Sequence, residues 1–221
     1  EFFGASEMKA IFSTNLIKGK IDGSAICDYL RLGYIPPHKT IYKNIHTLLP
    51  AHAGIVREGK IETWRYWNLK KKTLKISREE AKSEIKRLLD EAAGKRMVAD
   101  VEVGSFLSGG VDSTLATYYA KKHSQRPIKT FAVGYGDHIN ELPFALEASK
   151  KIGTEHYTLN SDIQNIADIK KVIAYFDEPH GDSSNLSQYL VSKLAASKVK
   201  VALSGDGADE FFMGYGWYQK Y

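Results

Sequence analysis

The sequence is poor in cysteine. Its 221 residues contain one, Cys27, which excludes an internal disulfide framework and fits a reducing compartment. Cys27 lies in the apolar, helix-like stretch 25–30, and we expect it to pack in a core rather than to act as a nucleophile. The sequence also lacks an apolar run long enough to cross a membrane and a secretory signal at its start, and it does not begin with methionine. We therefore expect a cytoplasmic protein with no membrane partner, and a chain that is processed, excised or partial.

No part of the chain carries a dense charge of one sign. The net charge is +5, but the lysines are scattered, and only Lys70–Lys72 form a tight cluster, which we assign to a solvated linker. We therefore expect no nucleic-acid partner. The content of 43% hydrophobic and 26% charged residues is typical of a globular protein, and the length indicates one large or two small domains.

The most informative stretch is 103–115. The apolar run 103–107 predicts a buried strand, and Ser108-Gly109-Gly110 ends it with two glycines that let a ligand approach the main chain. A helix follows, for which we expect Asp112 or Ser113 to be the N-cap. Free N–H groups and the positive end of the helix dipole meet at such a turn, so the pattern predicts a phosphate site.

The turn departs from the common nucleotide loops. It has neither the Gly-Lys-Ser/Thr of a Walker A loop nor a Gly-x-Gly-x-x-Gly pattern, and it carries a carboxylate, Asp112, in place of a lysine. A carboxylate beside phosphates is explained by a divalent cation between them. The alternative is an ordinary strand-to-helix turn with an aspartate cap, and the residues alone leave both interpretations open.

The rest of the chain predicts strands that alternate with helices. Ser77 to Glu80 form a capping box before a helix whose apolar residues share one face. Strands are expected at 128–134, 156–159 and 199–203, with helices at 141–152, 163–176 and 186–196. This alternation predicts a doubly wound parallel sheet of the α/β class, in which the turns 108–113, 134 onward and 204–210 share the carboxyl edge. Residues 1–67 read differently, as short helices and a hairpin with its turn at Glu58-Gly59.

Three motifs carry a resemblance to a known family. Ser108–Ser113 resembles the pyrophosphate loop of the ATP pyrophosphatase (PP-loop) superfamily, whose adenine-nucleotide α-hydrolase-like fold the resemblance implies. Leu203–Glu210 and Phe176–Ser184 are similar to the glutamine-dependent asparagine synthetases. The cues 5–10, 33–36, 49–52 and 66–67 resemble the end of that family's α+β, Ntn-type glutaminase domain. The resemblance implies a glutaminase remnant at 1–67, a linker at 68–76 and an ATP-dependent synthetase domain at 77–221.

The resemblance also implies roles for residues. Asp112 and Asp209 would hold Mg²⁺, Asp206 matches a functional acidic position of the family, and a solvated acidic turn is the alternative for the residues of the second motif. Asp182, Ser183 and Ser184 would contact the amino-acid substrate, with a helix cap at Asp182 or Ser183 as an equal alternative. ATP would be bound by the following residues: Leu107, Ser108, Gly109, Gly110, Asp112, Ser113, Val133, Ser204 and Gly205.

The implied reaction is ATP-dependent asparagine synthesis from aspartate through β-aspartyl-AMP, with nitrogen from glutamine or ammonia and release of AMP and pyrophosphate. A β-lactam-forming or other amide-forming relative and a non-catalytic nucleotide-binding paralogue are the alternatives. The glutaminase nucleophile and later catalytic residues of the family have no match, so we expect this chain alone to turn over poorly. We also expect residues 1–67 to expose apolar surface and the full-length protein to be a possible homodimer.

Overall fold

The structure is a computed structural model that describes residues 2–70, 72–134, 140–160, 166–182 and 184–219. The chain divides into two compact units. One consists of Glu1–Leu74 and Asn165–Asn185, and the other of Lys75–Gln164 and Leu186–Tyr221. The stretch 165–185, which we assigned to the synthetase domain, thus makes its contacts with the residues of the N-terminal segment.

The second unit is built on a four-stranded parallel sheet. Its strands are β3 (Val103–Phe106), β4 (Lys129–Gly134), β5 (Glu155–Asn160) and β6 (Val201–Leu203), in the order β5-β4-β3-β6. The first strand in sequence is therefore an inner strand, and the chain crosses to its other side to form β6. This order confirms the predicted doubly wound α/β fold.

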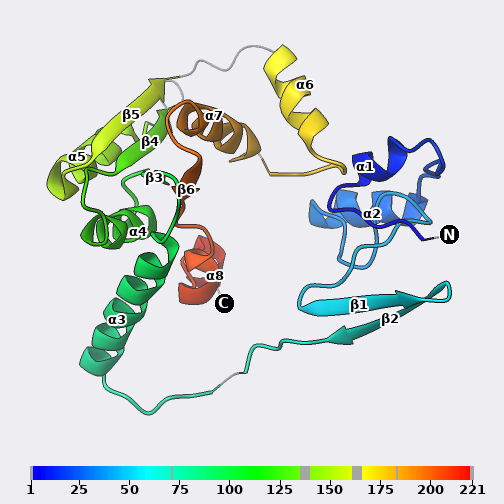
Figure 1. Cartoon of the computed structure of the whole chain (residues 1–221), viewed down its shortest axis with the longest axis horizontal. Helices are drawn as coiled ribbons and strands as arrows, with labels where there is room; N and C mark the ends of the chain where they lie inside the picture. Colours follow the sequence, from blue (N-terminus) through cyan, green and yellow to red (C-terminus); the bar gives the residue numbers. More distant parts are fainter. Residues whose placement is uncertain (1, 71, 135–139, 161–165, 183, 220–221) are drawn as a thin grey trace. The chain divides into compact units, whose positions relative to one another are not determined.

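Helices cover both faces of this sheet (Figure 1). On one face, α4 (Val111–Lys122) and α5 (Leu142–Ile152) contact the strands, and the Ser105 hydroxyl meets that of Thr117 at 2.8 Å. On the other face, α7 (Ser184–Ala196) contributes to a core in which Phe131, Ala195 and Val199 are buried. Because successive strand residues point to opposite faces, Ser105 serves the first layer while its neighbour Phe106 serves the second.

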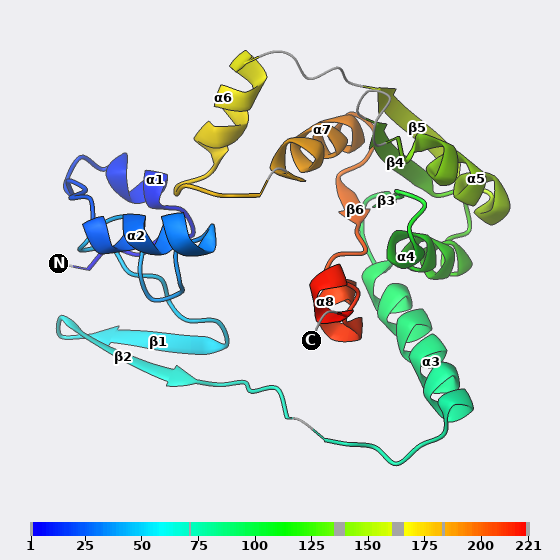
Figure 2. The ribbon, with the colours of Figure 1, turned by 180° about the vertical axis from the view of Figure 1, so that it is seen from behind.

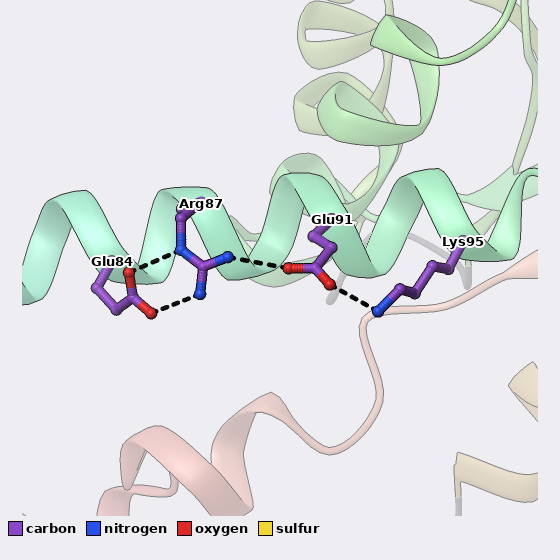
Figure 3. Close-up of polar contacts among 4 residues, drawn as sticks. All are labelled: Glu84, Arg87, Glu91 and Lys95. Atoms are coloured by element: carbon purple, nitrogen blue, oxygen red, sulfur yellow. Dashed lines mark hydrogen bonds and ion pairs between the residues drawn. The ribbon is translucent and has the colours of Figure 1, made fainter.

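The helix α3 (Arg78–Arg96) leads into the sheet. Its predicted capping box is present, since Glu80 N–H donates to Ser77 Oγ and Ser77 N–H donates to Glu80 Oε2. Figure 3 shows a ladder of ion pairs along its exposed side, from Glu84 to Arg87, Glu91 and Lys95. The apolar side chains of α3 are covered only in part: Ala93 is buried, whereas Ile85 and Leu88 are exposed.

The first unit contains short elements. These are α1 (Met8–Phe12), α2 (Gly23–Leu32), the antiparallel hairpin of β1 (His52–Arg57) and β2 (Lys60–Arg65), and α6 (Ile166–Tyr175), which Figure 2 shows from behind. The hairpin turns at Glu58 and Gly59 as predicted, and both residues have positive φ, as a tight two-residue turn requires.

The prediction that Cys27 packs in a core is wrong. Cys27 is exposed because α2 buries its opposite side, where Ala25 is fully buried, and leaves Ile26 and Leu30 exposed as well. Tyr66 and Trp67 are also exposed, so the expected apolar surface on this segment is confirmed. Among the described residues, no helix has the length and apolar character needed to span a membrane.

Candidate functional site

The first glycine loop joins β3 to α4. Leu107 is fully buried, and its N–H donates to the Phe131 carbonyl at 2.9 Å, which fixes the end of the strand. Gly109 has φ +85°, and a Cβ there would lie 2.5 Å from the carbonyl carbon of Phe144. Both the backbone conformation and the space therefore require glycine at this position.

The hydroxyls of Ser108 and Ser113 close this loop on itself. Their Oγ atoms lie 2.9 Å apart, Ser113 Oγ accepts from the Ser108 N–H at 3.2 Å, and Ser108 Oγ accepts from the Gly110 N–H at 3.2 Å. The two side chains are thereby held at the point where the strand passes into the helix. Hydroxyls in this position can turn toward an anion that replaces their mutual bond.

The predicted N-cap of α4 is wrong. The helix begins at Val111, Gly110 occupies the N-cap position in an extended conformation, and no side chain of the described residues caps it. Ser113 lies too far into the first turn, where its hydroxyl returns to Ser108, and Asp112 is the acidic residue of that turn. The N–H groups of the first turn thus keep the capacity to bind an anion.

The second glycine loop follows β6. Ser204 Oγ donates to Asp206 Oδ2 at 3.0 Å, and Gly207 has φ +93° at the N-cap of a short helix, α8 (Ala208–Phe212). We did not predict α8. The available signal was a glycine followed by Asp209 and Glu210, acidic residues that favour a first helical turn.

The two glycine loops contact each other. A Cβ on Gly205 would lie 2.8 Å from the Ser113 nitrogen and 3.0 Å from the Asp112 carbonyl carbon. The register explains this proximity: β3 and β6 are parallel neighbours, with Ser105 opposite Leu203, so their carboxyl ends meet. Val133, near the end of β4, belongs to the strand on the other side of β3. The structure therefore brings the residues predicted to bind nucleotide to the ends of three neighbouring strands.

The carboxylates of the second loop differ in their surroundings. Tyr215 donates to Glu210 Oε1 at 2.7 Å, which lowers the pKa of Glu210 and raises the pKa of Tyr215 to about 12.

Within the described part of the chain, no group of three or more histidine, cysteine or carboxylate side chains could hold a metal. Mg²⁺ does not need such a cage, because it is commonly held by one or two carboxylates together with phosphate and water. Asp112 and Asp209 have the carboxylate oxygens that Mg²⁺ prefers, and their role as its ligands stays a prediction.

The predicted substrate residues lie in the other unit. Asp182 Oδ1 accepts from the Ser184 N–H at 2.8 Å, and this bond lowers the pKa of Asp182. The capping alternative for Asp182 is therefore present at the start of α7, while Ser183 lies outside the described residues. A substrate role for Asp182 and Ser184 stays a prediction.

Two neighbouring carboxylates have partners that we did not predict. Asp177 Oδ2 accepts from the Met8 N–H at 2.5 Å, and Glu178 Oε1 accepts from the Ile41 N–H at 2.6 Å. Burial raises the pKa of Glu178. Sequence patterns carry no signal for such contacts, because the donors are main-chain groups more than a hundred residues away.

Comparison with known proteins yields two family matches. Residues 84–221 match the family model described as asparagine synthase, and residues 1–67 match a glutamine amidotransferase domain.

Curated relatives cover nearly the whole chain. A protein of Methanocaldococcus jannaschii described as a putative glutamine-hydrolyzing asparagine synthetase is 34% identical over 97% of this chain and 43% of its own length. A glutamine-hydrolyzing asparagine synthetase of Bacillus subtilis is 30% identical over 100% of this chain and 35% of its own length. The chain thus spans less than half the length of either relative. A solved NH3-dependent NAD synthetase from Campylobacter jejuni aligns over 61% of this chain and 60% of its own, at 17% identity and a TM-score of 0.42.

Proposed function

Because this chain belongs to the asparagine synthase family, we propose that its two glycine loops bind ATP and that the full-length gene product makes asparagine from aspartate. The observation that carries the proposal is the close approach of Gly205 to Asp112 and Ser113. It supports the proposal because the two loops, whose groups would bind the phosphates and the cation, lie side by side at the carboxyl edge of a parallel sheet, where ligands of such sheets bind.

The first loop is suited to the pyrophosphate part of ATP. The first-turn N–H groups of α4 and the hydroxyls of Ser108 and Ser113 provide donors for phosphate oxygens. Gly109 and Gly110 let the phosphates approach the main chain. Leu107, Val133, Ser204 and Gly205 would contact the remainder of the nucleotide.

Two carboxylates would hold the cation. We assign Asp112 and Asp209 to Mg²⁺, which when bound supplies charge neutralisation for the phosphates. Asp206, whose carboxylate accepts from the Ser204 hydroxyl, is our candidate for a catalytic acidic residue.

The reaction would proceed in two steps. The side-chain carboxylate of aspartate attacks the α-phosphorus of ATP, the bond to the β-phosphate oxygen breaks, and pyrophosphate leaves. Ammonia then attacks the β-aspartyl carbonyl carbon of the adenylate, and AMP leaves with the bonding electron pair. Asp182, Ser183 and Ser184 would contact the ammonium and carboxylate groups of aspartate. The protein's contribution would be positioning and charge neutralisation.

The amidotransferase match of residues 1–67 supports glutamine as a nitrogen source. No residue of this chain is assigned the role of the nucleophile that releases ammonia, and the exposed Cys27 lies on α2 outside the family's motifs. The use of glutamine therefore rests on this match and on the relatives that are described as glutamine-hydrolyzing.

ATP–pyrophosphate exchange on the full-length gene product tests the proposal. Labelled pyrophosphate should enter ATP only when aspartate and Mg²⁺ are both present. Exchange with another carboxylic acid but not with aspartate would indicate a different amide-forming synthetase. ATP binding without exchange under any condition would indicate a non-catalytic nucleotide-binding protein, and either result would overturn asparagine synthesis.

A further inference from the structure

The loop 176–181 belongs to one family match by its sequence and to the compact unit of the other family match by its contacts. By sequence it lies within the asparagine synthase match, residues 84–221. By its contacts it lies in the unit that contains Glu1–Leu74, which includes the amidotransferase match. The hydrogen bonds of this loop therefore join residues of the two family matches inside one compact unit.

Asp177 provides the first of these bonds. Its carboxylate accepts from two successive N–H groups at the start of α1, those of Met8 at 2.5 Å and Lys9 at 3.3 Å, and its side chain is 18% exposed. The side chain of Lys9 adds a second contact, because its ammonium donates to the Tyr175 carbonyl at 2.7 Å. A carboxylate at the N-terminus of a helix is in a favourable position, so α1 and the loop hold each other.

Glu178 and Gly181 form two further hydrogen bonds between this loop and the N-terminal segment. Glu178 Oε1 accepts from the Ile41 N–H at 2.6 Å, and the Gly181 N–H donates to the Gly33 carbonyl at 3.1 Å. A Cβ on Gly181 would lie 3.0 Å from that carbonyl oxygen, so the two main chains approach each other so closely that a side chain at this position would be crowded. The anchored stretch thus ends at the residue directly before Asp182.

We infer that Asp177, Glu178 and Gly181 are positioning residues that fix the aspartate-contacting stretch at the start of α7 to the amidotransferase-matched segment. The inference rests on the proposed function. Consecutive Cα atoms are about 3.8 Å apart, so Asp182 has little freedom to move once Gly181 is held. Loss of an anchor should therefore displace the groups that contact aspartate and leave the nucleotide loops unchanged, because those loops belong to the other compact unit.

The experiment compares Michaelis constants in ATP–pyrophosphate exchange by the full-length gene product. Glu178→Ala removes the acceptor for the Ile41 N–H, and Gly181→Ala crowds the Gly33 carbonyl. Glu178→Ala should raise the KM for aspartate about tenfold, the effect expected from losing one hydrogen bond to a charged group. Gly181→Ala should raise the same KM because its added methyl group pushes the main chain before Asp182 away from Gly33. In both variants the KM for ATP should stay within about twofold. Glu178→Gln keeps a carbonyl acceptor and should recover most of the affinity for aspartate.

A matched control is Glu62→Ala, which removes an exposed carboxylate from β2 of the same unit and should change neither constant. If the anchors served stability alone, the variants would yield less folded protein with unchanged KM values, and that result would overturn the inference. Equal increases in both KM values would also overturn it. A wild-type protein without aspartate-dependent exchange would instead refute the proposed function and the inference with it, whereas normal wild-type exchange with unaffected variants would refute the inference alone.

Discussion

Replacing Gly205 by alanine probes the contact between the two glycine loops. The added Cβ would lie 2.8 Å from the Ser113 nitrogen, where ordinary contact begins at 3.4 Å, so the loops must separate by about 0.6 Å. The two nearest atoms that it meets are main-chain atoms of Asp112 and Ser113, which cannot rotate away. Overpacking of this kind costs typically about 1–3 kcal/mol of stability.

The effect on activity should exceed the effect on stability. A displacement on the order of 1 Å between groups that position a substrate can reduce a rate about 100-fold. We therefore expect Gly205→Ala to lower ATP–pyrophosphate exchange by the full-length gene product about 10- to 100-fold, while thermal unfolding still shows a folded protein.

The matched control is Gly207→Ala in the same loop. Gly207 has φ +93°, so alanine is strained by about 1–2 kcal/mol, but no atom lies within 4 Å of the added Cβ. It should lose stability without a comparable loss of exchange. Wild-type exchange in Gly205→Ala, or an equal loss in both variants, would refute the argument that the contact between the loops sets the geometry of the site.

Three further outcomes follow from the described contacts. Gly109→Ala places a side chain at φ +85° and 2.5 Å from a main-chain carbon, whereas the Cβ of Gly110→Ala meets only a side-chain oxygen at 3.3 Å. The Gly109→Ala variant should therefore unfold at a clearly lower temperature than Gly110→Ala, and equal melting temperatures would contradict this. Burial lowers the pKa of His156 below its ordinary value of 6.5, so the unfolded chain binds a proton more readily than the folded chain, and the stability should be greatest above about pH 6.5 and fall below it. Unfolding measured at a series of pH values should show a smaller pH dependence in His156→Gln than in the wild type, and an unchanged dependence would contradict this. Asp182→Asn keeps an acceptor for the Ser184 N–H but loses the charge, so melting should change little while the KM for aspartate rises about tenfold or more, and an unaffected KM would count against a substrate role.

Local chemistry made much of the fold predictable. The capping box at Ser77 and the turn at Glu58-Gly59 each depend on residues only a few positions apart. The alternation of strands and helices then limited the sheet to a parallel order. The predicted positions of these elements are confirmed because short-range pattern and tertiary packing favour the same conformation.

The errors concern contacts that no local pattern encodes. The N-cap of α4 was misplaced because Ser113 bonds to Ser108 rather than to the helix that follows, and either partner would satisfy its hydroxyl. Cys27 was assigned to a core from its apolar neighbours, but α2 carries apolar residues on more than one side and buries the side that contains Ala25. The anchors at Asp177 and Glu178 join main-chain donors that are distant in sequence, so they appear only in three dimensions.

The two interpretations that the sequence left open for Asp182 are compatible. A cap requires a carboxylate held at the first turn of α7, and the bond from the Ser184 N–H provides this. The same bond lowers the pKa of Asp182, so the side chain stays ionised to lower pH, and an ionised carboxylate is the state that would bind the ammonium group of an amino acid. A carboxylate has two oxygens and about four acceptor positions, of which the cap uses one. The cap therefore orients the group that the proposed reaction needs and leaves acceptor positions free, and a structural role for Asp182 is no argument against a role in binding aspartate.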